Sequence, residues 1–364
     1  MFEKLCYNYD RMCAALFAAV KRSFEMFDEK EREDHLSLDF HTGIAPDMQF
    51  RMKVNLIALL MFLQIAAYVG TSYINGKLYY HIYRLFGSDP HLVDAVSDVV
   101  GMFETALSFL LPLWVVLLIF RDRIFRPYIP FAPTVPPHAV FTVFFCTAIL
   151  YTVGNVSTSV LSWIQSLDVP LRFYTPHIPT EPLRILLYFI SSGILPAFVE
   201  EMIFRGYILH LLLPHGKTFA IMVSAVLFGL MHQYLPQMLY ATVGGVLMAY
   251  YVVRSGSVWI GIFIHAMNNL FAFIQDMAYV FLPDAAYDVF HAVFGAMLLL
   301  FGIVGALVLC ARNSGMKREL PLETQSVYNR PLDTPTALRH ALTIPMIAYV
   351  LTAAYYTVLN SFRF

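Results

Sequence analysis

The sequence predicts an all-α, polytopic transmembrane helical bundle of about eight or nine spans with a cytoplasmic N-terminus. Three observations support that prediction. The 364 residues are 59% hydrophobic and only 13% charged, whereas soluble domains carry about 25% charged residues. Nine apolar stretches come close to the roughly 20 residues that a transmembrane helix needs. Lys and Arg, finally, are strongly biased toward one set of connecting segments.

The predicted spans follow one another with short connections. They are, in order, residues 54–72, 101–120, 139–163, 183–213, 219–234, 238–253, 258–280, 289–310 and 341–359. The fourth is too long for one perpendicular crossing, so we expect it to tilt or to end along the interface. Only residues 235–237 separate the fifth span from the sixth, which predicts a tight hairpin. The apolar character of the ninth is diluted by Thr343 and Pro345, with Asn360 just beyond it.

The orientation follows from the 24 Lys and Arg residues, because cytoplasmic loops carry an excess of both. With the N-terminus inside, eighteen of them fall on cytoplasmic segments and five on outer ones, while Arg205 lies within a span. This asymmetry supports the cytoplasmic N-terminus and a count of nine crossings.

The segments outside the spans are short. Residues 1–53 are the predicted N-terminal cytoplasmic segment, residues 54–182 hold the N-terminal spans, and residues 281–364 hold the C-terminal spans with a cytoplasmic loop near 313–340. In the first segment, apolar residues recur every three or four positions, which predicts an amphipathic helix at the membrane interface or one packed on the protein's own core. These residues are Leu5, Tyr9, Met12, Leu16, Val20, Phe24 and Phe27.

Composition also argues against some function classes. A net charge of −1 gives no basic footprint for nucleic acid. Cys6, Cys13, Cys146 and Cys310 form no C-x-x-C pair and predict neither a disulfide framework nor a zinc knuckle. No internal repeat is visible, which counts against a transporter assembled from two homologous halves.

Three short polar motifs interrupt the apolar spans. They are Glu200-Glu201-x-x-x-Arg205, Phe228-x-x-x-His232 and His265-x-x-x-Asn269. An ionisable group at membrane depth costs roughly 2.5–3.5 kcal/mol on insertion scales, so it marks a functional site inside the protein by default. We therefore expect these side chains to face the interior of the bundle.

Helical spacing separates the two carboxylates. Residues four apart share a helix face, so Glu201 and Arg205 are expected to form an ion pair. Glu200 points about 100° away and has no arginine at that spacing, so we expect it to stay unpaired and to act as a general base. The alternative for Glu201 and Arg205 is an ion pair that only holds the bundle together.

Depth brings the three motifs to one level. Counted from the cytoplasmic turns at about 1.5 Å per residue, Glu200 and His232 lie roughly 21–23 Å along their helices, and His265 roughly 15 Å. Asn269 lies one turn from His265 on the same face. A lone histidine in an apolar helix is more often a hydrogen-bonded core residue, but three helices that agree in depth predict one polar site.

Two chemistries fit such a site. Glu200, His232 and His265 could bind one divalent metal such as zinc and leave a position for water. Without a metal, Glu200 could polarise a water while His232 shares the proton, with His265 and Asn269 donating to an oxyanion. Both routes lead to hydrolysis of a carbonyl compound. The chain has neither the H-E-x-x-H of soluble zinc proteases nor the G-x-S-x-G of serine hydrolases.

The three motifs resemble those of the CPBP family of intramembrane proteases, which includes the type II CAAX prenyl endopeptidases and the bacterial Abi and bacteriocin-immunity proteins. The resemblance runs from about residue 183 to 273. It rests on L-P-A-F-V-E-E-M-I-F-R-G at 195–206, F-G-L-M-H at 228–232 and H-A-M-N-N at 265–269, in that order on successive helices.

The resemblance implies a catalytic core at residues 183–280. It implies that Glu200 and His232 activate water, that His265 and Asn269 stabilise the oxyanion, and that Glu201 and Arg205 support them. It leaves the metal open, because members have been described both as metalloproteases and as glutamate-dependent enzymes. The implied partners are the bilayer and a membrane-associated peptide or protein, and the favoured location is a bacterial plasma membrane.

Three functions follow as hypotheses. The first is an intramembrane endopeptidase. The second is a non-catalytic membrane protein that confers immunity by binding a bacteriocin or another partner, in which the polar cluster is structural. The third is a proton-coupled transporter that uses the carboxylates as a relay. Replacing Glu200 separates the first from the second, and flux driven by a pH gradient identifies the third.

Overall fold

The structure, a computed structural model, describes residues 46–121, 123–131, 139–173, 178–313 and 334–362. All the regular elements in these ranges are helices, apart from an isolated antiparallel bridge between Leu171 and Phe362. The all-α fold class predicted from the sequence is confirmed.

The helices divide into long spans and short connecting pieces. In chain order they are α2 (Pro46–Phe86), α3 (Pro90–Ile119), η1 (Arg123–Phe125), α4 (Ala139–Gln165), α5 (Pro182–Phe189), η2 (Ile190–Ile194), α6 (Leu195–Glu201), η3 (Met202–Ile208), α7 (Leu209–Leu212), η4 (Leu213–His215), α8 (Lys217–Met231), α9 (Leu235–Ser255), α10 (Val258–Phe281), α11 (Asp284–Asn313), α12 (Thr334–Ala341) and α13 (Ile344–Ser361).

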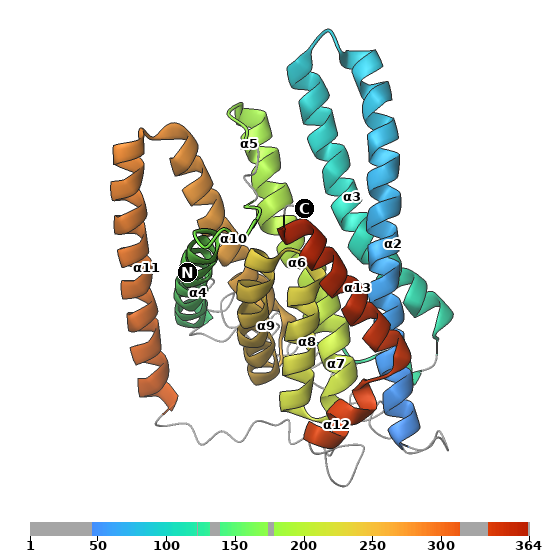
Figure 1. The fold of residues 1–364 in the computed structure, drawn as a ribbon. Coiled ribbons are helices and arrows are strands. Elements are labelled where there is room, and N and C mark those ends of the chain that lie inside the picture. The colour runs from blue at the N-terminus through green and yellow to red at the C-terminus, as the bar shows by residue number, and fades with distance from the viewer. Residues whose placement is uncertain (1–45, 122, 132–138, 174–177, 314–333, 363–364) are drawn as a thin grey trace, which may run out of the picture.

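The long helices pack as a bundle whose centre is formed by α6 to α10 (Figure 1). Helices α8 and α9 form one hairpin in this centre, and α10 packs against α4, α6 and α9. On one side α2 and α3 form a longer hairpin that projects beyond the centre, and on the other side α11 packs along α4 (Figure 1). The three polar motifs therefore lie on helices that meet in the middle of the fold.

Six helical stretches in the described part of the chain are long and apolar enough to cross a membrane. They are Asp47–Phe86, Pro90–Ile119, Ala139–Gln165, Pro182–His215, Val258–Phe281 and Asp284–Ala311. All nine predicted spans lie on helices. Helices α8, α9 and α13 do not meet both requirements, which are sufficient length and sufficient apolar character. Helix α8, with 15 residues, is about 22 Å long, whereas the hydrocarbon core of a bilayer is about 30 Å thick. The protein is an integral, multi-pass membrane protein, while nine crossings and the cytoplasmic N-terminus stay predictions.

The first hairpin differs from the sequence prediction. The sequence analysis placed no span between residues 72 and 101, but α2 continues to Phe86 and α3 begins at Pro90. Loss of hydropathy does not end a helix, and α2 runs through Gly70 and Gly76 and ends only at the turn from Gly87 to Pro90. The side chain of Asp89 accepts a hydrogen bond from the Leu92 amide at 3.2 Å and caps α3. At 41 residues, α2 is about 60 Å long and exceeds the bilayer core.

The predicted tight hairpin is present, but its turn lies earlier than expected. The turn occupies residues 232–234, where Gln233 has a φ of 50°, and Leu235 already begins α9. The sequence prediction placed the break at residues 235–237, which include Pro236, yet proline fits the first turn of a helix, where its missing N–H would be unpaired anyway. Gly245 lets the two helices approach, because a Cβ there would lie 2.8 Å from the Ala225 Cα.

The fourth span is one continuous helical path from Pro182 to His215 that contains two π-helical segments. The segment Met202–Ile208 has carbonyls that accept side-chain donors: the Ser224 hydroxyl donates to the Phe204 carbonyl at 2.8 Å, and His210 Nδ1 donates to the Arg205 carbonyl at 2.6 Å. These bonds fix the rotation of the helix just after the two glutamates, so side chains outside the three motifs help to aim them.

Two predictions fall largely or wholly on residues outside the described ranges. The amphipathic pattern of Leu5 to Phe27 lies in residues 1–45. The loop predicted near 313–340 lies mostly in residues 314–333. Its last part is a short helix, α12, rather than a loop, and α12 packs against α2 and α8.

Candidate active site

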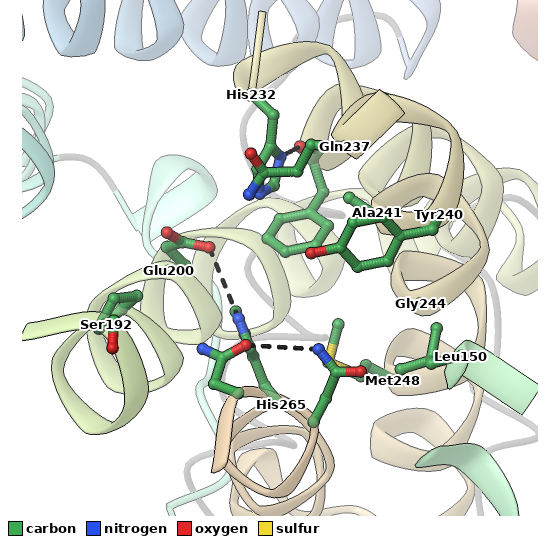
Figure 2. Close-up of a pocket in the computed structure, with 14 residues that line it drawn as sticks. Leu150, Ser192, Glu200, His232, Gln237, Tyr240, Ala241, Gly244, Met248 and His265 are labelled. Atoms are coloured by element: carbon green, nitrogen blue, oxygen red, sulfur yellow. Dashed lines mark hydrogen bonds and ion pairs between the residues drawn. The ribbon is translucent and has the colours of Figure 1, made fainter. Parts of the chain in front are cut away.

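One cavity of about 190 Å³ opens among α4, α6, α8, α9 and α10. It is lined by residues from all three motifs, and Figure 2 shows Glu200, His232 and His265 around it. The lining residues are Leu150, Ser192, Pro196, Glu200, Phe228, His232, Gln237, Tyr240, Ala241, Gly244, Met248, His265, Asn268 and Asn269. The structure thus brings together the four predicted catalytic residues, from three helices.

The two supporting residues form a buried ion pair behind the cavity. Glu201 and Arg205 are both 0% exposed, and Arg205 Nη1 lies 2.6 Å from Glu201 Oε1. The spacing argument predicted this pair. It did not predict that the same oxygen also accepts from His265 Nδ1 at 3.1 Å. Glu201 therefore joins the first motif to the third, and it fixes the orientation of the His265 ring.

Glu200 faces the other side of the same helix turn and reaches the cavity. It is almost fully buried, and its Oε2 has no hydrogen-bond partner among the described residues. His265 Nε2 lies 3.9 Å away (Figure 2). The sequence analysis paired Glu200 with His232, but the nearest charged or titratable contact of Glu200 in the described structure is His265. Because Nδ1 donates to Glu201, Nε2 is the ring atom that faces Glu200.

His232 follows the last residue of α8 and lines the cavity beside the α8–α9 turn. Its Nδ1 donates to the Phe228 carbonyl at 2.8 Å. A neutral ring that donates through Nδ1 carries its lone pair on Nε2, so Nε2 is the atom that can accept a proton. The backbone bond thus sets the tautomer that a proton acceptor in the cavity requires.

Phe228 is the aromatic centre of the site. Its ring packs edge-on against His232, with centroids 5.0 Å apart, and against His265 at 5.7 Å. The Arg205 guanidinium carbon lies 4.2 Å from the same ring centroid, in a cation–π contact. One side chain therefore holds both histidines and shields the buried arginine. The F-x-x-x-H spacing was noted in the sequence, but it gave Phe228 no role.

Asn269 reaches back to the first motif's helix. Its Nδ2 donates to the Gly193 carbonyl at 3.3 Å, and Gly193 lies in the π-helical segment before α6. Asn268 Nδ2 in turn lies 3.4 Å from Asn269 Oδ1. The second hydrogen of the Asn269 amide remains available as a donor. This chain of amides ties α10 to the helix that carries Glu200.

The three predicted metal ligands are not gathered into an ion site. Among the described residues, no group of three or more His, Cys, Asp and Glu side chains is arranged to hold an ion. Of the predicted ligands Glu200, His232 and His265, the contact found is that of His265 Nε2 with Glu200 at 3.9 Å.

Comparison with known proteins matches this part of the chain. The family model described as type II CAAX prenyl endopeptidase Rce1-like matches residues 182–271. Those residues include all three motifs and every helix that carries a predicted catalytic side chain. This part of the chain, which begins with α5 and ends within α10, is therefore similar to the Rce1-like family.

Part of the chain is also similar to a bacterial protein. The Bacillus subtilis (strain 168) protein named "Putative membrane peptidase YdiL" is 36% identical over 94 residues, which is 25% of this chain. The match spans 38% of that relative's length. No solved structure gives a significant match. The relative agrees with the bacterial location inferred from the sequence.

Sequence reasoning missed several residues that line this cavity. Asn268 precedes the predicted Asn269, and Tyr240 and Gln237 lie on α9, which carried no motif. The Tyr240 hydroxyl points into the cavity (Figure 2). Leu150 comes from α4, outside the core predicted at 183–280. Helical spacing could have grouped Gln237, Tyr240 and Gly244 on one face, but nothing local identifies the facing Leu150.

Proposed function

We propose that this protein is an intramembrane endopeptidase that hydrolyses a peptide bond with a water activated by Glu200 and His232. The observation that supports it is the meeting of Glu200, His232, His265 and Asn269 in one cavity, from three helices of a membrane bundle. The match to the Rce1-like family model over the same residues supports a peptidase as well.

Water activation falls to Glu200. Its Oε2 reaches the cavity without a protein hydrogen-bond partner, so a water there can donate a proton to it. His232 is the second acceptor, because its Nδ1 is committed to the Phe228 carbonyl and leaves Nε2 for the proton. The water oxygen then bonds to the substrate carbonyl carbon as its proton passes to Glu200.

The oxyanion formed by that attack needs hydrogen-bond donors within reach of the substrate carbonyl oxygen. Asn269 has one amide hydrogen left after its bond to the Gly193 carbonyl. His265 is the second proposed donor, because Glu201 holds its Nδ1 and leaves Nε2 to face the oxyanion. Glu201 and Arg205 position this ring rather than touch the substrate. The carbon–nitrogen bond breaks as the nitrogen takes the proton held by Glu200.

The substrate class follows from where the cavity lies. It is surrounded by helices that cross or line the membrane, so a peptide must enter from the bilayer or its surface. A membrane-associated peptide or protein is therefore the proposed partner. No observation in the described part of the chain favours a partner-binding protein without catalysis or a transporter.

The test is peptide cleavage by the purified full chain in liposomes. A library of membrane-inserting peptides with a quenched fluorophore supplies the probe. Glu200→Gln and His232→Ala should lower the rate by at least about 100-fold, since general acid–base groups contribute about 10²–10⁴-fold. Glu104→Gln is the matched control, because Glu104 is a carboxylate on α3, away from the cavity, that accepts hydrogen bonds from Ser72 and Asn75.

Cleavage by Glu200→Gln at the wild-type rate contradicts the proposal. An immunity phenotype that survives in Glu200→Ala, without any cleavage by the wild type, would replace it with the partner-binding alternative. Flux driven by a pH gradient in the same liposomes would replace it with the transporter.

A further inference from the structure

His232 lies in the turn between α8 and α9, and the backbone of this turn is unusual. The His232 amide donates to the Gly229 carbonyl at 3.1 Å, and the Gln233 amide donates to the Leu230 carbonyl at 3.2 Å. Gln233 then has a φ of 50°, a left-handed conformation that residues other than glycine rarely adopt. Such a conformation persists only where the surrounding structure holds it. The contacts around this turn therefore matter for the position of His232.

The C-terminal end of α13 holds this turn through two side chains. Asn360 Nδ2 donates to the Gln233 carbonyl at 2.9 Å, and the Ser361 hydroxyl oxygen accepts from the Leu235 amide at 2.8 Å. The first bond holds the left-handed residue itself. The second satisfies an amide in the first turn of α9, where an amide has no partner within its own helix. Helix α13 also packs against α8 and α9 (Figure 1).

The segment that follows α4 joins the same junction. The Tyr234 hydroxyl donates to the Arg172 carbonyl at 3.0 Å, and the Arg172 amide donates to the Ser361 carbonyl at 2.8 Å. Ser361 is 0% exposed, so its bonds are shielded from water. Three segments that are far apart in the sequence therefore meet at the turn that carries His232. Two of them lie outside residues 182–271, which match the family model.

The contacts of the His232 side chain within α8 do not by themselves aim it at the rest of the site. The hydrogen bond of Nδ1 and the edge-on ring contact both go to Phe228, one turn back on the same helix. They orient the ring relative to α8, whereas Glu200 lies on α6. The position of the end of α8 therefore decides how His232 faces the Glu200 carboxylate across the cavity. The junction with α13 holds that end of α8.

We infer that Asn360 and Ser361 are positioning residues for His232. They hold the α8–α9 turn in the conformation that keeps His232 Nε2 at the cavity, where it is the proposed second acceptor of the proton from water. Neither residue lines the cavity, so both act through the turn and not on the substrate. The inference rests on the proposed function and adds to the site two residues of α13, outside the segment that matches the family model.

The experiment measures peptide cleavage by Asn360→Asp and by Ser361→Ala. Aspartate keeps the shape of the asparagine side chain but replaces its donor with an oxygen that repels the Gln233 carbonyl. Each variant should lower kcat by about 10- to 100-fold, because a misplacement of about 1 Å can cost about 100-fold in rate. KM should stay within about twofold, since neither residue contacts the substrate. Thermal unfolding in detergent confirms that the variants are folded.

A second set of variants separates positioning from a general effect on the fold. In a His232→Ala background, Asn360→Asp should change the remaining rate by less than about twofold, because the group that it positions is gone. In an Asn269→Ala background the two losses should multiply. Asn155→Ala is the matched control, since Asn155 Nδ2 donates to the Tyr151 carbonyl at 2.9 Å from an exposed position on α4, and it should keep the wild-type kcat.

Two failures are distinguishable. If the wild type cleaves and Glu200→Gln does not, but Asn360→Asp and Ser361→Ala keep the wild-type kcat, the positioning role is wrong and the proposed function stands. A loss from Asn360→Asp that is equally large in the His232→Ala background also overturns the positioning role. Asn360→Ala, which removes the donor without adding a charge, replaces Asn360→Asp if that variant does not fold.

The other failure concerns the reaction itself. If the wild type cleaves no peptide, or if Glu200→Gln cleaves equally well, the proposed function fails and the positioning role fails with it.

Discussion

Two arginines of this protein hold carboxylates in opposite ways. Arg184, near the start of α5, donates through Nε to Asp98 and through Nη1 to Asp94, both at 2.9 Å and both on α3. Arg205 donates only to Glu201, through Nη1, and its Nε and Nη2 have no hydrogen-bond partner among the described residues. The guanidinium of Arg184 therefore has most of its hydrogen bonds at the edge of the fold, whereas that of Arg205 has few in the centre.

The surroundings explain the difference. Asp94 and Asp98 are 45% and 33% exposed, so water and salt screen the outer network. Glu201 and Arg205 are fully buried, where an unpaired charge is expensive. A bundle that needed only stability would place its arginine as Arg184 is placed. The inner pair is kept at a cost because Glu201 also orients His265, which points to function rather than to structure.

The largest expected effect comes from breaking the inner pair. Arg205→Ala leaves Glu201 as an uncompensated buried charge, and the loss of one partner of such a pair lowers the free energy of unfolding by about 3–5 kcal/mol. It should also abolish cleavage, because Glu201, which holds His265, loses the arginine that fixes its own position. Thermal unfolding in detergent and peptide cleavage measure the two effects. A stable, active Arg205→Ala would remove the functional difference between the two networks.

A smaller perturbation reaches the same network without removing a charge. A Cβ at Gly261 would lie 2.8 Å from Glu201 Oε2 and 3.0 Å from Val252 Cγ2. Gly261→Ala should therefore displace Glu201 and destabilise the fold by about 1–3 kcal/mol, the usual cost of overpacking. Cleavage should fall by about 10-fold in kcat. Gly101→Ala on α3 is the control, since a Cβ there meets nothing within 4 Å. Equal behaviour of the two variants would contradict the positioning role of Glu201.

The outer network should matter little. Arg184→Ala should lower the free energy of unfolding by about 0–1 kcal/mol, because partly exposed ion pairs contribute little. The difference from wild type should shrink further as salt is raised. Cleavage should stay within about twofold of wild type. A loss of cleavage comparable to that of Arg205→Ala would mean that the hairpin of α2 and α3 is part of the active site.

The smallest expected effect is that of metal removal. Glu200, His232 and His265 do not form a ligand set in the described structure, so dialysis against a chelator should leave the cleavage rate unchanged. Metal analysis of the purified protein before and after dialysis is the control. A loss of cleavage that zinc restores would show that the inner network rearranges around an ion.

Much of this arrangement could be predicted from the sequence, and the limits have physical causes. Helical spacing predicted the pair of Glu201 with Arg205, and agreement in depth predicted that Glu200, His232 and His265 would meet. Neither could show that Glu201 also holds His265, because a contact between helices depends on their rotation and packing. The position of Leu150 on the cavity wall was missed for the same reason, since α4 packs on α9 although the two helices are far apart in sequence.

The ends of the helices were harder to predict than the helices themselves. Composition predicted where the chain enters the membrane but not where helices end, so α2 runs about four turns past its predicted end at residue 72. The α8–α9 turn was predicted too late in the sequence. Pro236 lies in the first turn of α9, and the effect of a proline depends on its position in the helix. How many of the helices cross the membrane fully remains a prediction of the sequence.

The wide π-helical turn before α6 has a consequence for how the site tolerates deletions. Such a turn spends about one residue more than an α-helix needs for the same rotation. Deleting one residue from Ile190–Ile194 would therefore leave an ordinary α-helical turn, and the half of the span that starts at Pro182 would nearly keep its rotation relative to Glu200. The wide turn itself would be lost, and its Gly193 carbonyl is the group that accepts from the Asn269 amide. A deletion here can thus disturb the site although no residue of the three motifs has changed.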